Sequence, residues 1–463
     1  MKGLLFFISG LLCLVASINA QSLSIEESYA RNSPGVVMVQ TVFSGTVYVR
    51  KVDINQKNFD KLVDSIRALD PLQTMLSAEQ KLDLLISTLY RSPARFFSPT
   101  FEYLSQRHRF IANGTGIFIS SDGYVLTNCH VIERDSAYIQ RQFMLSTFQE
   151  VTENSITSLE QSWQVSLSEE QRNILFDVYS FLYSRTSPMQ LSDVEKEINV
   201  VYRIGNDKNN EARIKKVARV LIKGDPMPGK DVAVLKIDDV RNLPSLKIAR
   251  ESVPRIGSRA LVIGFPDPVG NNAFLAKESV NEPTLTVGVI SSIKHSVNNF
   301  PVIQMDAIIA HGSSGSPVCN EKGEVIGLAT FGSIEKKSGI LASGFNFAVP
   351  VSVIREFIDS LKILPEQGSA SALYNQGLHF FYTSYYRKAL AKFKEVENVN
   401  ANYPMLYSFM NEAERKAASD FDKQNYFEKY FFRIMAVFLI LAGIYVYFRR
   451  LGARRRLFNR KKR

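Results

Sequence analysis

Residues 114–132 read GTGIFISSDGYVLTNCHVI, and this stretch predicts two strands joined by a turn, with His130 directly after the second strand. Apolar, often β-branched residues flank the turn Ser121-Asp-Gly123, which is the pattern of a β-hairpin. A histidine at the end of a strand can project into a cleft. The stretch therefore predicts a β-rich fold that presents His130 at one end of a sheet.

Two later segments supply residue types that complement a histidine. Asp231-Val-Ala-Val-Leu-Lys-Ile237 places an acid ahead of an alternating strand, and Gly312-Ser-Ser-Gly-Ser-Pro-Val318 is a tight turn that exposes Ser314 between glycines. An acid that steadies an imidazole, which in turn deprotonates a hydroxyl, is the arrangement of nucleophilic catalysis. We predict that His130, Asp231 and Ser314 form a catalytic triad.

Each of these residues also has a structural interpretation. His130 by itself could be a buried core histidine, and Ser314 could belong to a glycine-serine loop without function. The carboxylates of Asp225, Asp238 and Asp239 compete with that of Asp231. The alternating strand that follows Asp231, together with the other two motifs, favours the catalytic interpretation.

The three motifs and their order resemble those of the trypsin-like serine peptidases, in particular the HtrA/Deg branch. That family has Thr-Asn-x-His-Val, Asp-x-Ala-Val/Leu-Leu and Gly-Asn-Ser-Gly-Gly-Pro, whereas this chain has Ser313 for the Asn and Ser316 for the second Gly. The resemblance covers roughly residues 33–361. It implies a mainly β fold, a double six-stranded antiparallel β-barrel of the chymotrypsin type.

The resemblance also implies further site residues. Backbone amides of Gly312, Ser313 and Ser314 would form the oxyanion hole, and Thr330, Phe331 and Gly332 would line the substrate cleft. No metal and no organic cofactor are implied. The one acid shortly before the nucleophile, Asp306, matches a structural position of the family, so we expect small or aliphatic side chains at the cleaved position.

Two stretches interrupt the predicted barrels. The segments at about residues 51–109 and 140–197 have helical patterns, and we interpret them as helical insertions. Three serines followed three residues later by Gln or Glu are capping-box candidates for helix starts: Ser77/Gln80, Ser168/Gln171 and Ser192/Glu195.

Residues 369–420 are predicted to be helical. Seven positions follow the spacing of a single tetratricopeptide unit: Leu373, Gly377, Phe380, Tyr386, Ala389, Phe393 and Val396. An ordinary helical stalk fits the pattern almost as well. Because one such unit cannot bury its own apolar face, it must pack on the peptidase domain, on itself or on a protein partner.

The two ends of the chain predict export and membrane anchoring. Residues 1–20 have the basic start, apolar run and small-residue end of a cleavable signal peptide, an uncleaved anchor being the alternative. Residues 430–448 are predicted to span a membrane once, rather than to form a buried core helix. The basic tail, residues 449–463, is then cytosolic, and the catalytic domain is extracytoplasmic, periplasmic if the host is bacterial.

The net charge of +11 does not point to a nucleic acid partner. Nine of the basic residues lie among the last fifteen, and the rest of the chain is nearly neutral. A nearly neutral domain does not attract a polyanion such as a nucleic acid. After removal of a signal peptide only Cys129 and Cys319 remain, either as one bridge or, as we favour, as two buried thiols.

These observations predict a membrane-anchored serine endopeptidase that acts on polypeptides through an acyl-enzyme, in protein quality control or processing. The alternative is a protease-fold scaffold or sensor, catalytically silent or zymogen-like, that binds partner proteins through its helical segments. Reactivity of Ser314 separates the two.

Overall fold

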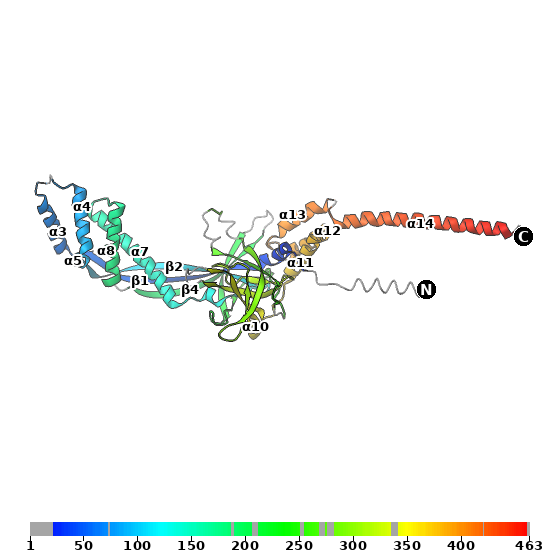
Figure 1. Cartoon of the computed structure of the whole chain (residues 1–463), viewed down its shortest axis with the longest axis horizontal. Coiled ribbons are helices and arrows are strands. Elements are labelled where there is room, and N and C mark those ends of the chain that lie inside the picture. The colour runs from blue at the N-terminus through cyan, green and yellow to red at the C-terminus, as the bar shows by residue number, and fades with distance from the viewer. Residues whose placement is uncertain are drawn as a thin grey trace. The chain divides into compact units, whose positions relative to one another are not determined.

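The structure is a computed structural model that describes residues 22–72, 75–186, 189–205, 212–250, 254–267, 274–275, 282–334, 341–419 and 421–460. The predicted signal peptide, residues 1–20, therefore lies outside the described residues. The chain divides into two compact units (Figure 1). Unit 1 comprises Met1–Val39, Gly114–His130 and Val200–Arg463, and unit 2 comprises Gln40–Asn113 and Val131–Asn199.

Twelve strands of the described chain form two six-stranded sheets, and each sheet closes into a barrel. The first barrel has the order β1-β2-β3-β6-β5-β4. Its strands are β1 (Val36–Ile54), β2 (Phe97–Phe118), β3 (Tyr124–Thr127), β4 (Gln190–Ile204), β5 (Ala212–Lys223) and β6 (Ala233–Ile237). The prediction of the hairpin around Ser121-Asp-Gly123 is confirmed, because β2 pairs with β3 through Ile117 and Leu126.

The second barrel has the order β10-β11-β12-β9-β8-β7, and every neighbouring pair in it is antiparallel. Its strands are β7 (Arg259–Gly264), β8 (Thr284–His295), β9 (Pro301–Met305), β10 (Pro317–Cys319), β11 (Val325–Ile334) and β12 (Leu341–Pro350). Helix α10 (Val351–Ser360) follows. Apolar side chains from both barrels form one core, in which Leu126, Leu261 and Leu328 are fully buried.

The predicted insertions contain helices, and two of the three capping boxes exist. The helices are α3 (Gln56–Leu69), α4 (Ala78–Arg91), α5 (Pro93–Phe96), α7 (Ser136–Trp163) and α8 (Glu169–Thr186). At the start of α4 the hydroxyl of Ser77 and the side chain of Gln80 each bond the other's backbone amide. Ser168 and Gln171 make the same two bonds before α8. Figure 1 shows α3, α4 and α8 gathered at the end of unit 2.

The third capping box is wrong, and the error reveals the main difference from the predicted fold. Ser192 and Glu195 lie in strand β4, where the Glu195 carboxylate accepts hydrogen bonds from Ser44 of β1 and Arg107 of β2. Strands β1, β2 and β4 run on into the segments that we expected to be helical. The protein is therefore a mixed α/β protein rather than a mainly β one.

The helices after the second barrel pack on the barrel domain itself. They are α11 (Ser369–Tyr382), α12 (Tyr386–Val399) and α13 (Leu406–Ala417), and their core also includes Ala30 of α2 (Ile25–Asn32). The Ser245 amide donates to the Ser371 hydroxyl at 2.9 Å, and the Gly205 amide donates to the Asn402 carbonyl at 2.9 Å. The apolar face of a single helical pair is thereby covered by the same chain.

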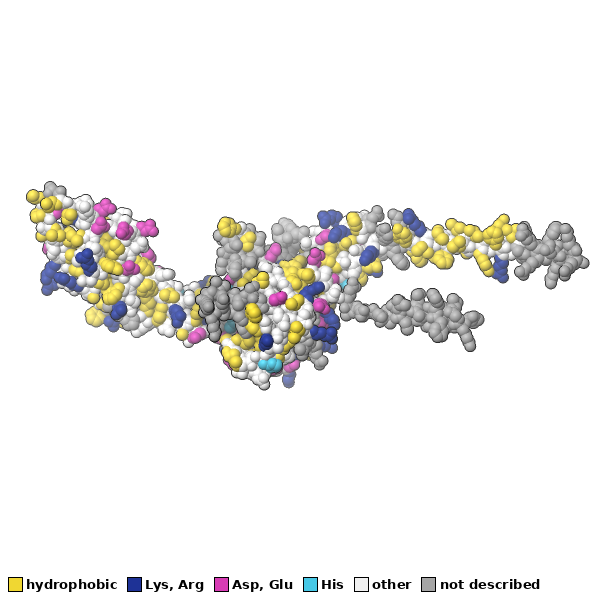
Figure 2. All heavy atoms as spheres, viewed as in Figure 1, with side chains coloured by type: hydrophobic (Ala, Val, Ile, Leu, Met, Phe, Trp, Pro, Cys, Tyr) yellow, Lys and Arg dark blue, Asp and Glu magenta, His cyan; other side chains and the backbone are white. Residues whose placement is uncertain are grey.

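Helix α14 (Lys423–Arg460) contains a stretch, Lys423–Leu451, that is long and apolar enough to cross a membrane, with a mean hydropathy of 2.1 in its most apolar 18-residue window. None of that window is buried. Figure 2 shows apolar side chains standing along this helix, where Phe438 and Leu439 are about two-thirds exposed.

Candidate active site

The pairing of β3 with β6 brings His130 and Asp231 together. Thr127 at the end of β3 lies opposite Ala233 at the start of β6. His130 follows in the short helix α6 (Cys129–Ile132), and Asp231 comes two residues before β6. Because antiparallel strands place the end of one beside the start of the next, residues 101 positions apart become neighbours.

The imidazole and the carboxylate form a close pair. Nδ1 of His130 lies 2.6 Å from Oδ2 of Asp231, and the His130 backbone amide donates to Oδ1 at 2.9 Å. The Thr330 hydroxyl also donates to Oδ2. Asp231 is fully buried, and a buried carboxylate is tolerated only when its oxygens accept hydrogen bonds of this kind. The contact through Nδ1 leaves Nε2 of His130 as the nitrogen available for proton transfer.

Ser314 lies on a sharp turn between two left-handed glycines. Gly312 has a φ of +85° and Gly315 a φ of +87°, a conformation that disfavours any residue with a Cβ. A Cβ at Gly315 would also approach the Thr115 carbonyl oxygen to 1.9 Å. The turn therefore requires glycine at both positions, and Ser314 lies between them.

Thr330 links the serine to the histidine–aspartate pair. Oγ of Ser314 donates to the carbonyl oxygen of Thr330 at 3.0 Å, while the hydroxyl of Thr330 donates to Asp231. Thr330 of β11 thus bonds Ser314 through its backbone carbonyl and Asp231 through its side chain, and Asp231 in turn contacts His130. In the described part of the chain, no hydrogen bond joins Nε2 of His130 to Oγ of Ser314.

The turn offers two of the three predicted oxyanion donors. The Ser313 amide donates to the carbonyl of Ala310 at 2.9 Å, so in this structure it is engaged elsewhere, and its predicted part in the oxyanion hole stays a prediction. The amides of Gly312 and Ser314 make no hydrogen bond among the described residues. These two donors on one turn are the remaining candidates for stabilising a developing oxyanion.

Of the predicted cleft residues, only Thr330 has a described side chain, and that side chain is committed to Asp231. Phe331 and Gly332 are described as backbone positions of β11, opposite Phe347 and Asn346 of β12. Whether all three contact a substrate stays a prediction.

Thr115 is a residue that the sequence reasoning missed. It is fully buried, its amide donates to the Ser314 carbonyl at 2.7 Å, and its hydroxyl donates to the Gly312 carbonyl at 2.8 Å. The same hydroxyl accepts from the Phe265 amide at 3.0 Å. The available signal was its place between Gly114 and Gly116, which marks a close backbone approach.

The cysteines take no part in this chemistry. Cys129 and Cys319 are both buried and unbridged, as we favoured from the sequence. Burial raises the pKa of the Cys319 thiol to about 12, which keeps it protonated and unreactive. The Sγ of Cys129 donates to the carbonyl of Gly224.

Comparisons with known proteins match the part of the chain that contains this site. Residues 114–328 match the family model of the trypsin-like peptidase domain, which covers all three predicted catalytic residues. This match agrees with the paired barrels and the His130–Asp231 geometry: residues 114–328 are similar to a trypsin-like peptidase domain.

The curated proteins to which the chain is similar are serine endoproteases of the Deg and HTRA names. The chain is 34% identical over 137 residues to the serine endoprotease DegS of Escherichia coli K12, covering 28% of this chain and 35% of that protein. It is 34% identical over 134 residues to a probable periplasmic DegP-like serine endoprotease of Rhizobium meliloti, covering 28% and 24%. The matched segment thus spans only a quarter to a third of these relatives.

Two more distant comparisons cover more of the chain. The mitochondrial serine protease HTRA2 of Drosophila willistoni is 24% identical over 277 residues, 58% of this chain and 43% of that protein. The solved HtrA-type protease AlgW with decapeptide aligns over 73% of this chain and 67% of its own, at 22% identity and a TM-score of 0.37.

Proposed function

We propose that this protein is a serine endopeptidase in which Ser314 is the nucleophile, His130 the general base and acid, and Asp231 the group that orients the imidazole. The observation that carries the proposal is the buried Asp231 carboxylate, which holds Nδ1 of His130 at 2.6 Å and shares Thr330 with Ser314. A fully buried acid that fixes one imidazole nitrogen leaves the other to accept a proton.

The reaction follows from these positions. Oγ of Ser314 attacks the carbonyl carbon of a peptide bond, and its proton passes to Nε2 of His130, which then protonates the leaving amine. In the second half of the reaction, Nε2 of His130 takes a proton from water, which attacks the acyl carbonyl carbon. His130 then returns that proton to Oγ of Ser314 as the acyl group leaves. The amides of Gly312 and Ser314 donate to the oxyanion, each such donor being worth about 10²–10³ in rate.

For the first step, the Ser314 hydroxyl must leave the Thr330 carbonyl and donate to Nε2 of His130 instead. This contact is the specific observation that favours the second candidate, a zymogen-like state in which the nucleophile is held away from its base.

We keep the proposal that the enzyme prefers small or aliphatic side chains at the cleaved position. The Asp306 carboxylate accepts from the Val289 amide at 2.6 Å, a structural hydrogen bond within the second barrel. An acid occupied in this way is a poor candidate for recognising Lys or Arg.

We also propose that α14 anchors the protein in a membrane, with the peptidase domain on the extracytoplasmic side and the tail in the cytosol. Exposed apolar side chains along α14 support anchoring, because such a surface is costly in water. The excess of Arg and Lys after residue 448 supports the orientation. Processing or quality control of extracytoplasmic proteins fits this placement.

A fluorophosphonate probe tests the activity directly. The wild-type chain should be labelled covalently, and Ser314→Ala should not be, because the probe reacts only with an activated serine. Wild-type protein that stays unlabelled, even after mild heating or addition of unfolded polypeptide, would favour the silent scaffold. Labelling only after such treatment would identify the zymogen-like state.

A further inference from the structure

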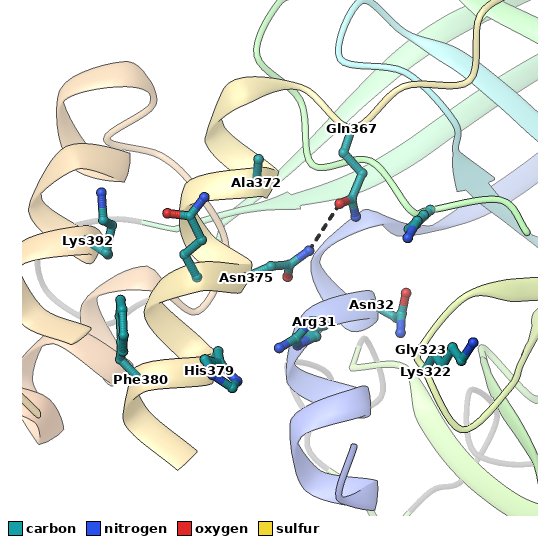
Figure 3. Close-up of a pocket in the computed structure, with 12 residues that line it drawn as sticks. Arg31, Asn32, Lys322, Gly323, Gln367, Ala372, Asn375, His379, Phe380 and Lys392 are labelled. Atoms are coloured by element: carbon teal, nitrogen blue, oxygen red, sulfur yellow. Dashed lines mark hydrogen bonds between the residues drawn. The ribbon is translucent and has the colours of Figure 1, made fainter. Parts of the chain in front are cut away.

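A second concave site lies in unit 1, away from the triad. It is a cavity of about 510 Å³ between α2, α11 and the β10–β11 turn (Figure 3). That volume lies within the range of small-ligand sites, roughly 300–1,000 Å³. Asn375 and His379 point from α11 toward Arg31 of α2, and Lys322 lies on the opposite wall. The helical segment and the peptidase domain therefore both contribute to one pocket.

The charged side chains that line the cavity are all basic. Four cationic side chains line the cavity, Arg31, Lys247, Lys322 and Lys392, and no acidic side chain is among its described lining residues. Three of these cations pair with carboxylates outside the lining. In the part of the chain that the structure describes, Lys322 makes no ion pair, so its ammonium group is available to a ligand.

One lining residue, Asn375, also carries a hydrogen-bond acceptor that lacks a donor. Oδ1 of Asn375 is buried and has no hydrogen-bond partner, whereas its Nδ2 lies 3.5 Å from Oε1 of Gln367. A buried amide oxygen without a partner is unfavourable, and a ligand N–H would satisfy it. A ligand that suits this site therefore brings both negative charge and N–H donors.

The lining residues of α11 are spread along the helix rather than gathered at one point. Ala372, Asn375, Gln376 and His379 follow the spacing i, i+3, i+4, i+7 and share one face of α11. Seven residues of helix rise about 10 Å, which is the length of about three residues of extended chain. A compact anion such as phosphate would fill only part of this wall.

We propose that this cavity binds an acidic peptide segment of about three residues, with a carboxylate on Lys322 and a backbone N–H on Asn375. An acidic peptide combines the two features that the lining requires, negative charge and amide donors along a line. The proposal concerns a site distinct from the triad and does not depend on catalysis.

Binding is tested on the full chain in detergent, carrying Ser314→Ala so that the probe cannot be cleaved. Fluorescence anisotropy is recorded with fluorescein-labelled hexaglutamate, and labelled hexaglutamine is the neutral control. We expect saturable binding of hexaglutamate that weakens with added salt, and at least tenfold weaker binding of hexaglutamine. Equal binding of both peptides would overturn the proposal.

Variants locate the site. Lys322→Glu and Gln376→Glu, both at exposed positions of the lining, should each weaken hexaglutamate binding at least tenfold. Lys294→Glu on β8, exposed and outside the lining, makes the same change in charge as Lys322→Glu and should alter binding less than twofold. Equal losses in all three would indicate general surface charge and refute the site. Full displacement by inorganic phosphate at the same concentration as unlabelled hexaglutamate would refute a peptide ligand.

Discussion

Replacing Thr115 by Val removes one buried hydroxyl and leaves a side chain of nearly the same shape. In the native protein this hydroxyl donates to the Gly312 carbonyl at 2.8 Å and accepts from the Phe265 amide at 3.0 Å. Valine can do neither, so two buried backbone groups lose their partner. One of them belongs to the turn that carries Ser314 and the proposed oxyanion donors.

The size of the effect follows from those two groups. A buried polar group left without a partner costs about 1–3 kcal/mol, so Thr115→Val should destabilise the fold by about 2–6 kcal/mol. The turn can relieve part of this cost by rotating the Gly312 peptide, which would misplace an oxyanion donor. Since about 1.4 kcal/mol of barrier is tenfold in rate, we expect a ~10- to 10³-fold slower reaction.

The assay is the second-order rate of fluorophosphonate labelling, measured at a temperature where thermal unfolding shows each variant to be folded. Thr115→Ser is the matched control, because it keeps the hydroxyl and loses only a methyl group. Its labelling rate should stay within about threefold of wild type. Folded Thr115→Val that reacts at the wild-type rate would refute the role of the hydroxyl, as would an equally slow Thr115→Ser.

Three further predictions concern the His130–Asp231 pair, the insertion that contains Ser77 and the proposed membrane anchor α14. Asp231→Asn should keep the fold and lower the labelling rate by about 10⁴-fold, because the imidazole takes the wrong tautomer; a loss below tenfold would contradict its role. Ser77→Ala should lower the free energy of unfolding by about 1 kcal/mol in thermal denaturation, whereas Ser192→Ala, in an exposed part of β4, should change it by less than about 0.5 kcal/mol. A fluorescent protein fused after Arg463 should fluoresce in the cytosol, and protease accessibility of that fusion from outside would reverse the proposed orientation.

The candidate site could be proposed from the sequence because its signals are local. A glycine-flanked serine, a histidine after a strand and an acid before a strand are short patterns whose geometry depends on a few adjacent residues. The start of α4 is local in the same sense, since Ser77 and Gln80 are one helical turn apart.

The errors arose where partners distant in the sequence decide the structure. Ser192 and Glu195 have the residue types of a helix start. They lie in a strand instead, where the Glu195 carboxylate accepts hydrogen bonds from Ser44 and Arg107 of other strands. The hydrogen bond from the Ser313 amide to the Ala310 carbonyl was also not foreseen, because it depends on how the whole turn folds.

The amino-acid sequence alone determined which three residues are candidates for the chemistry, because that choice depends on residue types and spacing over a few positions. Only the tertiary structure decided what surrounds them: Thr330 between Ser314 and Asp231, Thr115 beneath the nucleophile turn, and strands that extend into the insertions. Such contacts join residues up to 199 positions apart, as in the hydrogen bond from the Thr115 amide to the Ser314 carbonyl. They form only when the barrels close, and no local pattern encodes them.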